Sequence, residues 1–341
     1  MLYNIPIDYR LISDKMLRKL IISRLNKYNA MVSRMTPEQI NEKQELFREY
    51  CSNRPMAINT IDANKQHYEV PAEFFTKILS KHMKYSGSIW QDTSKLNNSD
   101  ENTLKLYANR TEINDGDTIL ELGAGWGSLS LYIAQNFKNS FITAVTNSKQ
   151  QKQYISTNIK ELNLTNIKVI LSDVNDFDPQ DRFDRIMSIE MFEHLRNPSL
   201  LFKKIDNWLT KNGKLFIQVF SHREYPQFFD NTRSSWMAKN FFTGGMMPYA
   251  GFYRDICKPL SQNKQWTISG SNYHYTLEAW LKRLDDNNTE LQSLLRKSWP
   301  HNISNRYINR YRLFLLICSE LFKYNDGKDW YIMHYLFDKQ S

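Results

Sequence analysis

The strongest constraint on the fold of this chain is a short apolar strand that runs into a glycine-rich turn and then a helix. The segment reads Ile119-Leu-Glu-Leu-Gly-Ala-Gly-Trp-Gly-Ser128, with glycines at positions 123, 125 and 127. Such a turn lets backbone N–H groups and the start of a helix approach a ligand. Dinucleotide-binding enzymes use a similar glycine pattern, so the turn indicates a ligand site without naming the ligand.

Strand and helix patterns alternate around this turn. We expect strands at 117–122, 141–146, 167–171, 183–189 and 213–220, and helices at 127–137, 148–162 and 198–210. Parallel strands need crossover connections, which helices usually supply. The pattern therefore predicts an α/β fold, with a parallel sheet covered by helices on both faces.

The alternation ends near residue 221. Beyond it we expect a mobile loop at Phe241-Phe-Thr-Gly-Gly-Met-Met-Pro248 and strand character from Trp266 to Leu277. Helices should follow from about 277 to 322, and a closing strand from Trp330 to Phe337. Without repeats or a low-complexity linker, the chain is predicted to form one compact domain, 61–341, preceded by a helical extension, 1–60.

The extension combines apolar and basic residues at helical spacing. A second helix should begin after Thr36, with Pro37 at its first position and Gln39 completing a capping box. The apolar residues of the first helix are Leu11, Met16, Leu17, Leu20, Ile21 and Leu25. Such a basic amphipathic segment could lie on a membrane. The more usual interpretation is packing against the catalytic domain, or against a partner subunit in a homodimer.

Composition narrows the function classes. The net charge is +9, but the 45 basic residues are interleaved with 36 acidic ones, so we expect no nucleic-acid partner. The three cysteines Cys51, Cys257 and Cys318 lie far apart, which argues against a disulfide framework or a zinc site, and we expect no metal. The sequence has neither a bilayer-spanning apolar run nor a signal-peptide pattern at its start, so a cytoplasmic location is expected.

Polar residues follow the first three strands at the edge where a ligand should bind. Glu121 suits the cationic end of a ligand, such as the ammonium of a methionyl group. Asn147 and Gln151 can bind ribose hydroxyls without a charge, where nicotinamide enzymes use an acid. Asp173 can reach an adenine amino group or can cap a turn.

The fourth strand ends in a cluster of acid and base groups. In Ile186-Met-Ser-Ile-Glu-Met-Phe-Glu-His-Leu195, a helical turn starting near Glu190 would place Glu193 and His194 on the same face. Carboxylates and an imidazole at a strand end are what a proton-handling site needs. The alternative is that Glu193 and His194 only cap or orient the helix.

The chain resembles the cyclopropane-fatty-acid-synthase superfamily of S-adenosylmethionine-dependent methyltransferases, and within it the plant benzylisoquinoline N-methyltransferases of the coclaurine type. The resemblance runs from about residue 60 to the C-terminus. It rests on Gln66-His-Tyr-Glu-Val-Pro71, Glu121 to Ala134, Ser188 to His194, Phe241 to Gly245, and Glu320-Leu-Phe-Lys-Tyr-Asn-Asp-Gly327. It implies a class I, Rossmann-like methyltransferase fold, whose seven-stranded sheet carries an N-terminal helical extension and a helical substrate-capping insertion. The implied cofactor is S-adenosylmethionine.

The superfamily contains two chemistries, and the resemblance separates them. Lipid-cyclopropanating members bind a bicarbonate base through a cysteine, a glutamate, a histidine and a tyrosine. This chain keeps the glutamate as Glu193, but Gly87, Gln218 and Phe314 stand at the other three positions. Glu190 occupies a place where those members have glycine, and there it matches the N-methyltransferases. The resemblance therefore implies methylation of a small amine, aromatic or alkaloid-like, with a lipid C-methyltransferase as the alternative.

These patterns together define the expected site. Glu190 and Glu193 should attract the ammonium form of the amine, and His194, with a pKa raised by the carboxylates, should accept its proton. The residues expected to bind the cofactor are Tyr68, Tyr85, Ser86, Glu121, Gly123, Gly125, Gly127, Thr146, Asn147, Gln151, Asp173, Val174 and Ser188. His67, Phe241, Phe322 and Trp330 are expected to contact the substrate, although a lone histidine is more often structural and such aromatic residues are more often core.

Overall fold

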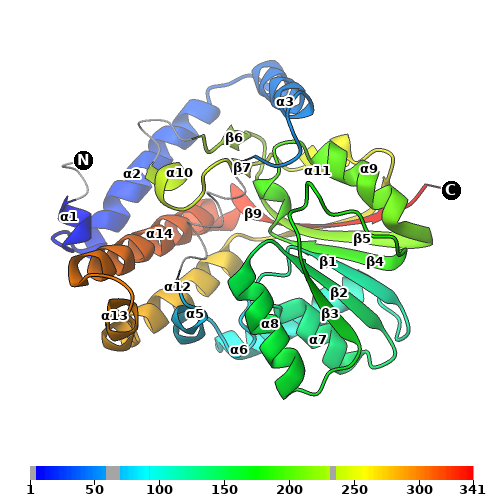
Figure 1. Ribbon diagram of the computed structural model, residues 1–341. Coiled ribbons are helices and arrows are strands. Elements are labelled where there is room, and N and C mark those ends of the chain that lie inside the picture. Colours follow the sequence, from blue (N-terminus) through cyan, green and yellow to red (C-terminus); the bar gives the residue numbers. More distant parts are fainter. Residues whose placement is uncertain (1–4, 59–69, 92, 231–235, 341) are drawn as a thin grey trace.

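A computed structural model describes residues 5–58, 70–91, 93–230 and 236–340, and Figure 1 shows their arrangement. Seven strands form one sheet in the order β3-β2-β1-β4-β5-β9-β8. Five are parallel: β1 (Thr118–Leu122), β2 (Phe141–Thr146), β3 (Ile167–Leu171), β4 (Phe183–Ile189) and β5 (Leu209–His222). β9 (Trp330–Asp338) and β8 (Ser261–Ile268) extend the sheet antiparallel. The predicted seven-stranded α/β fold is confirmed.

Alternate residues of the central strands face two different helical layers. Ile119 and Met187 share a core cluster with Leu104 of α6 (Leu96–Arg110) and Leu129 of α7 (Ser128–Asn136). Their chain neighbours Leu120 and Ile186 belong instead to a cluster with α9 (Pro198–Trp208) and α11 (Phe252–Ile256). α8 (Lys149–Glu161) covers β2 and β3 on the α7 side. The near-continuous apolar strands follow from burial on both faces.

A helical cap lies beyond the carboxyl edge of the parallel strands (Figure 1). It contains α5 (Ala72–Ile78), α10 (Trp236–Asn240), α12 (Ser271–Asp286), α13 (Asn288–Arg296) and α14 (His301–Gly327), with the short strands β6 (Gln227–Phe228) and β7 (Met246–Met247). The predicted strand from Trp266 to Leu277 is wrong beyond Ile268. Leu277, Trp280, Leu281 and Leu284 recur at helical spacing and are buried, so this segment belongs to α12.

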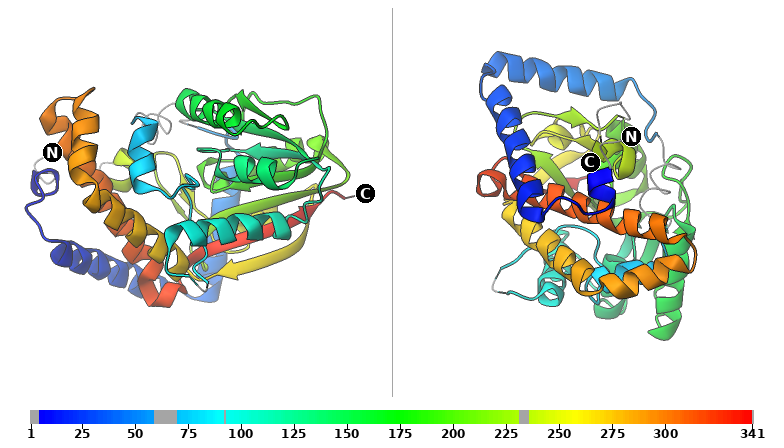
Figure 2. Two further views of the ribbon diagram at one scale, coloured as in Figure 1. Left: turned by 90° about the horizontal axis from the view of Figure 1, so that it is seen from below. Right: turned by 90° about the vertical axis from the view of Figure 1, so that its left-hand side faces the viewer.

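The N-terminal extension packs on both the cap and the sheet domain (Figure 2). It consists of α1 (Ile5–Asp8), α2 (Asp14–Val32) and α3 (Pro37–Ser52). The predicted capping box is present at the start of α3: the Thr36 N–H donates to Gln39 Oε1 at 2.9 Å, and the Gln39 N–H donates to Thr36 Oγ1 at 3.3 Å. α2 lies along α14, while Phe47 of α3 joins the core cluster of β4 and β5. The predicted boundary at residue 60 lies outside the described residues.

Ion pairs anchor the start of the extension to α14. The buried guanidinium of Arg312 bonds Asp14 at the start of α2 and Asp285 at the end of α12. Arg310 bonds both carboxylate oxygens of Asp8, at 2.7 and 2.9 Å. The Arg312 guanidinium lowers the pKa of Asp14, the direction expected for a carboxylate with a close cation. One arginine therefore links three helices.

We predict that Arg312→Met lowers the free energy of unfolding by about 2–4 kcal/mol, because it leaves two half-buried carboxylates close together without their cation. Urea unfolding measures the change. Lys282→Met is the matched control, since the Lys282–Asp286 pair is exposed and should contribute less than about 1 kcal/mol. Equal losses in the two variants would contradict the anchoring role of Arg312.

Candidate active site

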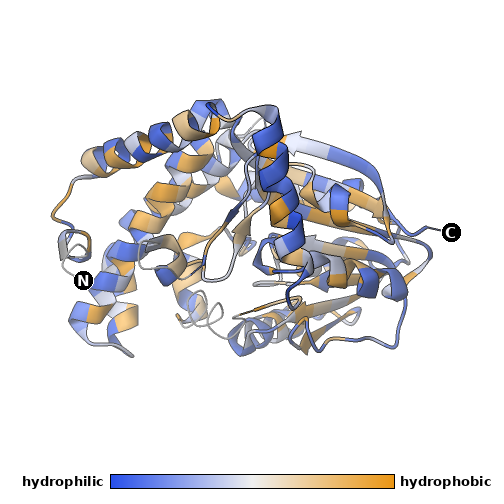
Figure 3. Ribbon diagram, turned by 90° about the horizontal axis from the view of Figure 1, so that it is seen from above, coloured by the Kyte–Doolittle hydropathy of each residue, from blue (hydrophilic) through white to orange (hydrophobic). Residues whose placement is uncertain are grey.

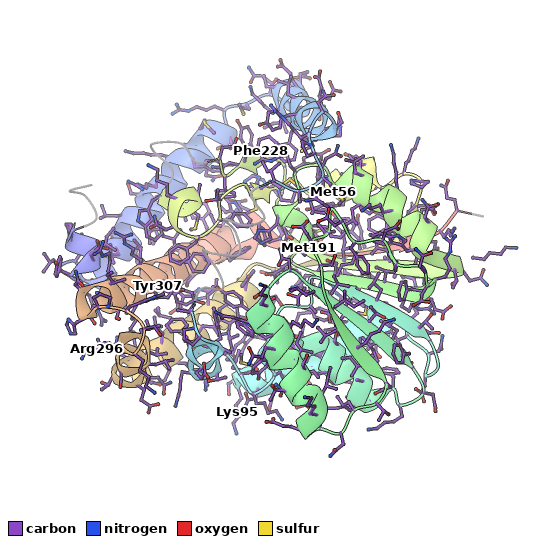
Figure 4. All side chains as sticks on the ribbon, viewed as in Figure 1. Met56, Lys95, Met191, Phe228, Arg296 and Tyr307 are labelled. Atoms are coloured by element: carbon purple, nitrogen blue, oxygen red, sulfur yellow. The ribbon has the colours of Figure 1, made fainter. Side chains whose placement is uncertain are left out.

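A cavity opens at the carboxyl ends of β1, β2 and β4, between the sheet and the cap. Figure 4 labels Met191, one of its lining residues, at this edge of the sheet. The residues predicted for the site that line the cavity are Tyr85, Ser86, Glu121, Gly123, Gly125, Thr146, Asn147, Gln151, Val174, Glu190 and His194. The fold therefore brings together strand ends and the segment before α6, which are far apart in sequence.

The turn after β1 forms the floor of the cavity. Gly123 and Gly125 have φ angles of 76° and 53°, in the left-handed region that favours glycine. A side chain at Gly123 would collide with Met191, whereas the Cβ position at Gly125 faces open space. Glu121 is buried beneath the turn and accepts a hydrogen bond from Ser130. Burial raises the pKa of Glu121 to about 7, which leaves a carboxyl group ready to ionise beside a cationic ligand.

The first turn of α8, just after β2, presents a donor that no described residue satisfies. Thr146 donates from Oγ1 to Gln151 Oε1 at 2.6 Å, which fixes the orientation of the Gln151 amide. Gln151 Nε2 is buried and has no hydrogen-bond partner among the residues that the structure describes. Buried polar groups are normally satisfied, so an orphaned donor lining a cavity indicates a ligand acceptor such as a hydroxyl. Together with Glu121, this donor set fits a ligand that has a cationic group and sugar hydroxyls.

Several residues predicted to bind the cofactor do not line the cavity. Gly127 caps α7 with a φ of 82° and gives room to Ile155, so its role is helix packing. Asp173 accepts a hydrogen bond from the Asn175 N–H at 2.9 Å and therefore caps a turn. Ser188 is fully buried and donates to the Leu122 carbonyl at 2.9 Å, which ties β4 to β1. The predictions for His67 and Tyr68 lie outside the described residues.

Glu190 does not begin a helical turn, so the predicted shared face with Glu193 and His194 is wrong. Its φ is 51°, and the short 3₁₀ helix begins only at Phe192. This backbone turn directs the carboxylate toward three donors. The Gly87 N–H and Gln218 Nε2 bond Glu190 Oε1 at 3.0 and 2.8 Å, and the Tyr273 O–H bonds Oε2 at 2.7 Å. The carboxylate is held in one orientation by β5, α12 and the segment before α6.

A buried chain of hydrogen bonds orients one of these donors. Arg110 can only donate, so its bond to His334 Nδ1, at 2.6 Å, places the histidine proton on Nε2. His334 Nε2 then donates to Gln218 Oε1 at 2.7 Å, and the Tyr107 O–H donates to the same oxygen at 2.6 Å. With its carbonyl occupied, Gln218 must direct its amide N–H groups toward Glu190 and the Gly87 carbonyl. Burial and the charge of Arg110 keep the pKa of His334 well below its usual value.

Glu193 lies behind the cavity rather than in it. Its Oε1 accepts a hydrogen bond from the Phe220 N–H at 2.7 Å, and Oε2 is buried without a partner among the described residues. Burial and the nearby Glu190 raise the pKa of Glu193 well above its usual value, which disfavours its charged form. These surroundings work against the electrostatic attraction to an ammonium that was predicted for Glu193.

His194 lines the cavity, but its predicted pKa shift has the opposite sign. Its ring packs edge-on against Phe242, with centroids 4.8 Å apart. Burial lowers the pKa of His194 to about 4, because desolvation disfavours the imidazolium. The imidazole is therefore neutral at pH 7, and the lowered pKa makes it a weaker base than an exposed histidine.

Lys84 is a site residue that sequence analysis missed. It is fully buried, lines the cavity, and donates to Ser86 O, Ser86 Oγ and Gly87 O at 3.1, 2.9 and 2.7 Å. Burial lowers the pKa of Lys84 to about 8. Its three bonds shape the segment that presents Ser86 to the cavity and Gly87 to Glu190. Its position beside the Tyr85-Ser86 motif was a usable signal, whereas nothing local marked Tyr273.

The three aromatic residues predicted to contact substrate do not line the cavity. Phe322 stacks on Tyr273, with ring centroids 4.4 Å apart, and so supports a partner of Glu190. Phe241 stacks on Phe314 at 4.7 Å, and Trp330 packs against Tyr28 and His222. All three are at least 95% buried and belong to the core cluster of the cap.

Among the described residues, no group of histidine, cysteine, aspartate and glutamate side chains is arranged to hold a metal.

We predict that Gln218→Leu lowers the free energy of unfolding by about 2 kcal/mol or more, since it leaves Glu190, His334 and Tyr107 each short of a buried hydrogen bond. Urea unfolding at pH 7 measures the loss. Gln153→Leu, on the exposed face of α8, is the matched control and should change stability by less than about 0.5 kcal/mol. A Gln218→Leu variant as stable as the parent would contradict the hydrogen-bond chain.

Known proteins share both the sequence and the fold. The family model described as mycolic acid cyclopropane synthetase matches residues 56–331. An (S)-coclaurine N-methyltransferase from Thalictrum flavum subsp. glaucum is 33% identical over 98% of this chain and 94% of its own length. A cyclopropane-fatty-acyl-phospholipid synthase from Escherichia coli (strain K12) is 27% identical over 79% of this chain and 66% of its own length.

A crystal structure of coclaurine N-methyltransferase bound to N-methylheliamine and SAH superimposes with a TM-score of 0.94 at 30% identity, covering 98% of each chain. The match includes the N-terminal extension, which the resemblance seen in the sequence covered only loosely. The strand-end cavity, the orphaned amide of Gln151 and the buried Glu121 agree with this likeness. The chain belongs to the mycolic acid cyclopropane synthetase family and is an S-adenosylmethionine-dependent methyltransferase.

Proposed function

We propose that this enzyme methylates the amine nitrogen of a small aromatic molecule of the alkaloid type. The observation that carries the proposal is the Glu190 carboxylate, which three donors hold at the cavity wall near the neutral imidazole of His194. A buried carboxylate attracts a cation, and a neutral imidazole accepts a proton. An amine that arrives as an ammonium ion needs both functions. The relatives named as coclaurine and pavine N-methyltransferases support the same substrate class.

The residues of the chain divide the work between binding and proton transfer. Bound S-adenosylmethionine supplies an electrophilic methyl group, and Glu121, Gln151 and the turn at Gly123 are the residues that would hold it. Glu190 binds the ammonium, and its fixed orientation limits the positions that the nitrogen can take. His194 then accepts the ammonium proton and leaves the lone pair free. Alignment of the two reactants supplies much of the acceleration in reactions of this type.

The position of Glu190 also disfavours the lipid alternative. A side chain at Gly87 would lie 2.9 Å from the ring of Tyr273, so the cysteine of cyclopropanating relatives has no room there. Gln218 and Tyr273 donate hydrogen bonds to the Glu190 carboxylate instead of to a free bicarbonate ion. In this chain the carboxylate at that place therefore belongs to a protein side chain and not to a bound bicarbonate ion.

None of the described helices is long and apolar enough to cross a membrane. A cytoplasmic location and a homodimer stay predictions.

We predict that Glu190→Gln reduces turnover of a tetrahydroisoquinoline amine by about 100-fold or more, because the amide lacks the charge that binds the ammonium. His194→Gln should reduce turnover to a similar extent, because it removes the base. Glu193→Gln should reduce turnover less than tenfold, since burial disfavours the charge of Glu193 and an amide oxygen still accepts the Phe220 N–H. Turnover with labelled S-adenosylmethionine gives the rates, and calorimetry checks cofactor binding. Full activity in Glu190→Gln and His194→Gln would exclude the proposed roles.

Cofactor affinity should depend on pH through Glu121. A cationic ligand favours the carboxylate, while the free enzyme protonates Glu121 below about pH 7. The dissociation constant of S-adenosylmethionine should therefore rise as the pH falls from 8 to 6, by up to about tenfold per pH unit below the pKa. Calorimetry at several pH values tests this. In Glu121→Gln binding should be weaker and lose this pH dependence; an unchanged dependence would assign it to another group.

A further inference from the structure

The outer surface of α2 and the turn before it is unusually apolar for a surface helix. Six large apolar side chains in this segment have exposed fractions between 38% and 71%: Tyr9, Leu11, Met16, Leu20, Ile22 and Met31. Met16, Leu20 and Met31 lie on one stripe, because positions 16, 20, 27 and 31 repeat at helical spacing. In Figure 3, hydrophobic and hydrophilic residues alternate along α2 at the edge of the molecule.

These side chains are not the ones that attach α2 to the protein. Leu17, Ile21, Leu25 and Tyr28 face inward and pack against the core cluster of the cap. The apolar residues of this segment thus form two sets. The inner set packs on the cap, and the outer set is exposed to solvent. Packing on the cap therefore explains only half of the pattern.

The charges of this segment divide in the same way. Among the described residues 9–37, every exposed charged side chain is basic: Arg10, Lys15, Lys19, Arg24, Lys27 and Arg34. The acids of the segment and its start, Asp14 and Asp8, are turned inward to Arg312 and Arg310. Arg18 also faces inward, where it bonds Glu278. The outward surface, which we call the α2 face, therefore combines large apolar groups with cations and presents no exposed acid.

We propose that the α2 face binds the surface of an anionic lipid membrane. Its apolar side chains would enter the boundary between headgroups and acyl chains, while its lysines and arginines meet the lipid phosphates. A second copy of the chain fits less well. A twofold interface would place the α2 face against itself and oppose six cations with six cations. Membrane binding of this kind is peripheral and leaves the cavity between sheet and cap unobstructed by a crossing helix.

The test uses the full-length enzyme and vesicles of two compositions. Co-sedimentation is measured with phosphatidylcholine vesicles and with vesicles that contain about 30% phosphatidylglycerol, an anionic lipid. We expect binding to the anionic vesicles only, and loss of most binding at about 0.5 M salt, where charges are strongly screened. Equal binding to both vesicles, or to neither, would overturn the proposal.

Two double variants separate the contributions of the α2 face. Lys15→Glu with Lys19→Glu, and Leu11→Ser with Leu20→Ser, should each weaken vesicle binding at least tenfold. Lys105→Glu with Lys211→Glu makes the same change in net charge at exposed sites on the sheet domain and is the matched control. Because all these residues are exposed, melting temperatures should stay near that of the parent, and turnover of a soluble amine should not change.

Light scattering and vesicle binding together distinguish the other occupants. If the parent enzyme is a dimer and the Leu11→Ser, Leu20→Ser variant is a monomer, the α2 face binds a second copy. That result would overturn membrane binding. Vesicle binding that falls equally in the control variant would show a general charge effect and would also overturn it. If the leucine variant fails to fold, the two lysine double variants still test the proposal. They change the net charge equally, so a difference in their vesicle binding depends only on where the charge lies. None of these readouts depends on amine methylation.

Discussion

The active site depends on burying one carboxylate, that of Glu190, in a single orientation. An ionised carboxyl group can leave water only where donors replace its hydration. The fold supplies three donors from three separate segments, and a further chain through Gln218, His334 and Arg110 fixes one of them. A positive φ at a residue with a side chain costs about 1 kcal/mol or more. Here that strained backbone directs the carboxylate toward its three donors.

Burial shifts the pKa values of neighbouring groups in opposite directions. Glu193 and His194 are adjacent in sequence, and desolvation disfavours the charged form of both, since it raises the pKa of Glu193 and lowers the pKa of His194. Burial raises the pKa of Glu190 as well, but Lys84 nearby and the hydrogen bonds from Tyr273, Gly87 and Gln218 oppose that rise. These partners fit the proposed roles, in which Glu190 binds the cation and His194 accepts its proton.

Sequence patterns predicted the sheet well and the side-chain geometry poorly. Strand positions followed from apolar runs between turn signals, and these signals are local. The stretch after Ile268 was misjudged, since its aromatic residues suit a strand, but the spacing of Leu277, Trp280, Leu281 and Leu284 buries a helical face. Likewise Ser188 and Asp173 were predicted from residue type and position, but Ser188 donates to the Leu122 carbonyl and one oxygen of Asp173 caps a turn.

The sequence alone determined the α/β class, the ligand turn at 123–127 and the grouping of Glu190 and His194 at a strand end, because periodicity, glycine spacing and strand direction are local properties of the chain. Only the tertiary structure decided which groups carry charge, which donors hold Glu190, and that Lys84, Tyr273 and His334 support the site. The physical reason is that pKa values and hydrogen bonds depend on burial and on partners distant in sequence. The same holds for α2, where ion pairs to α14 turn its acids inward and leave its cations outside.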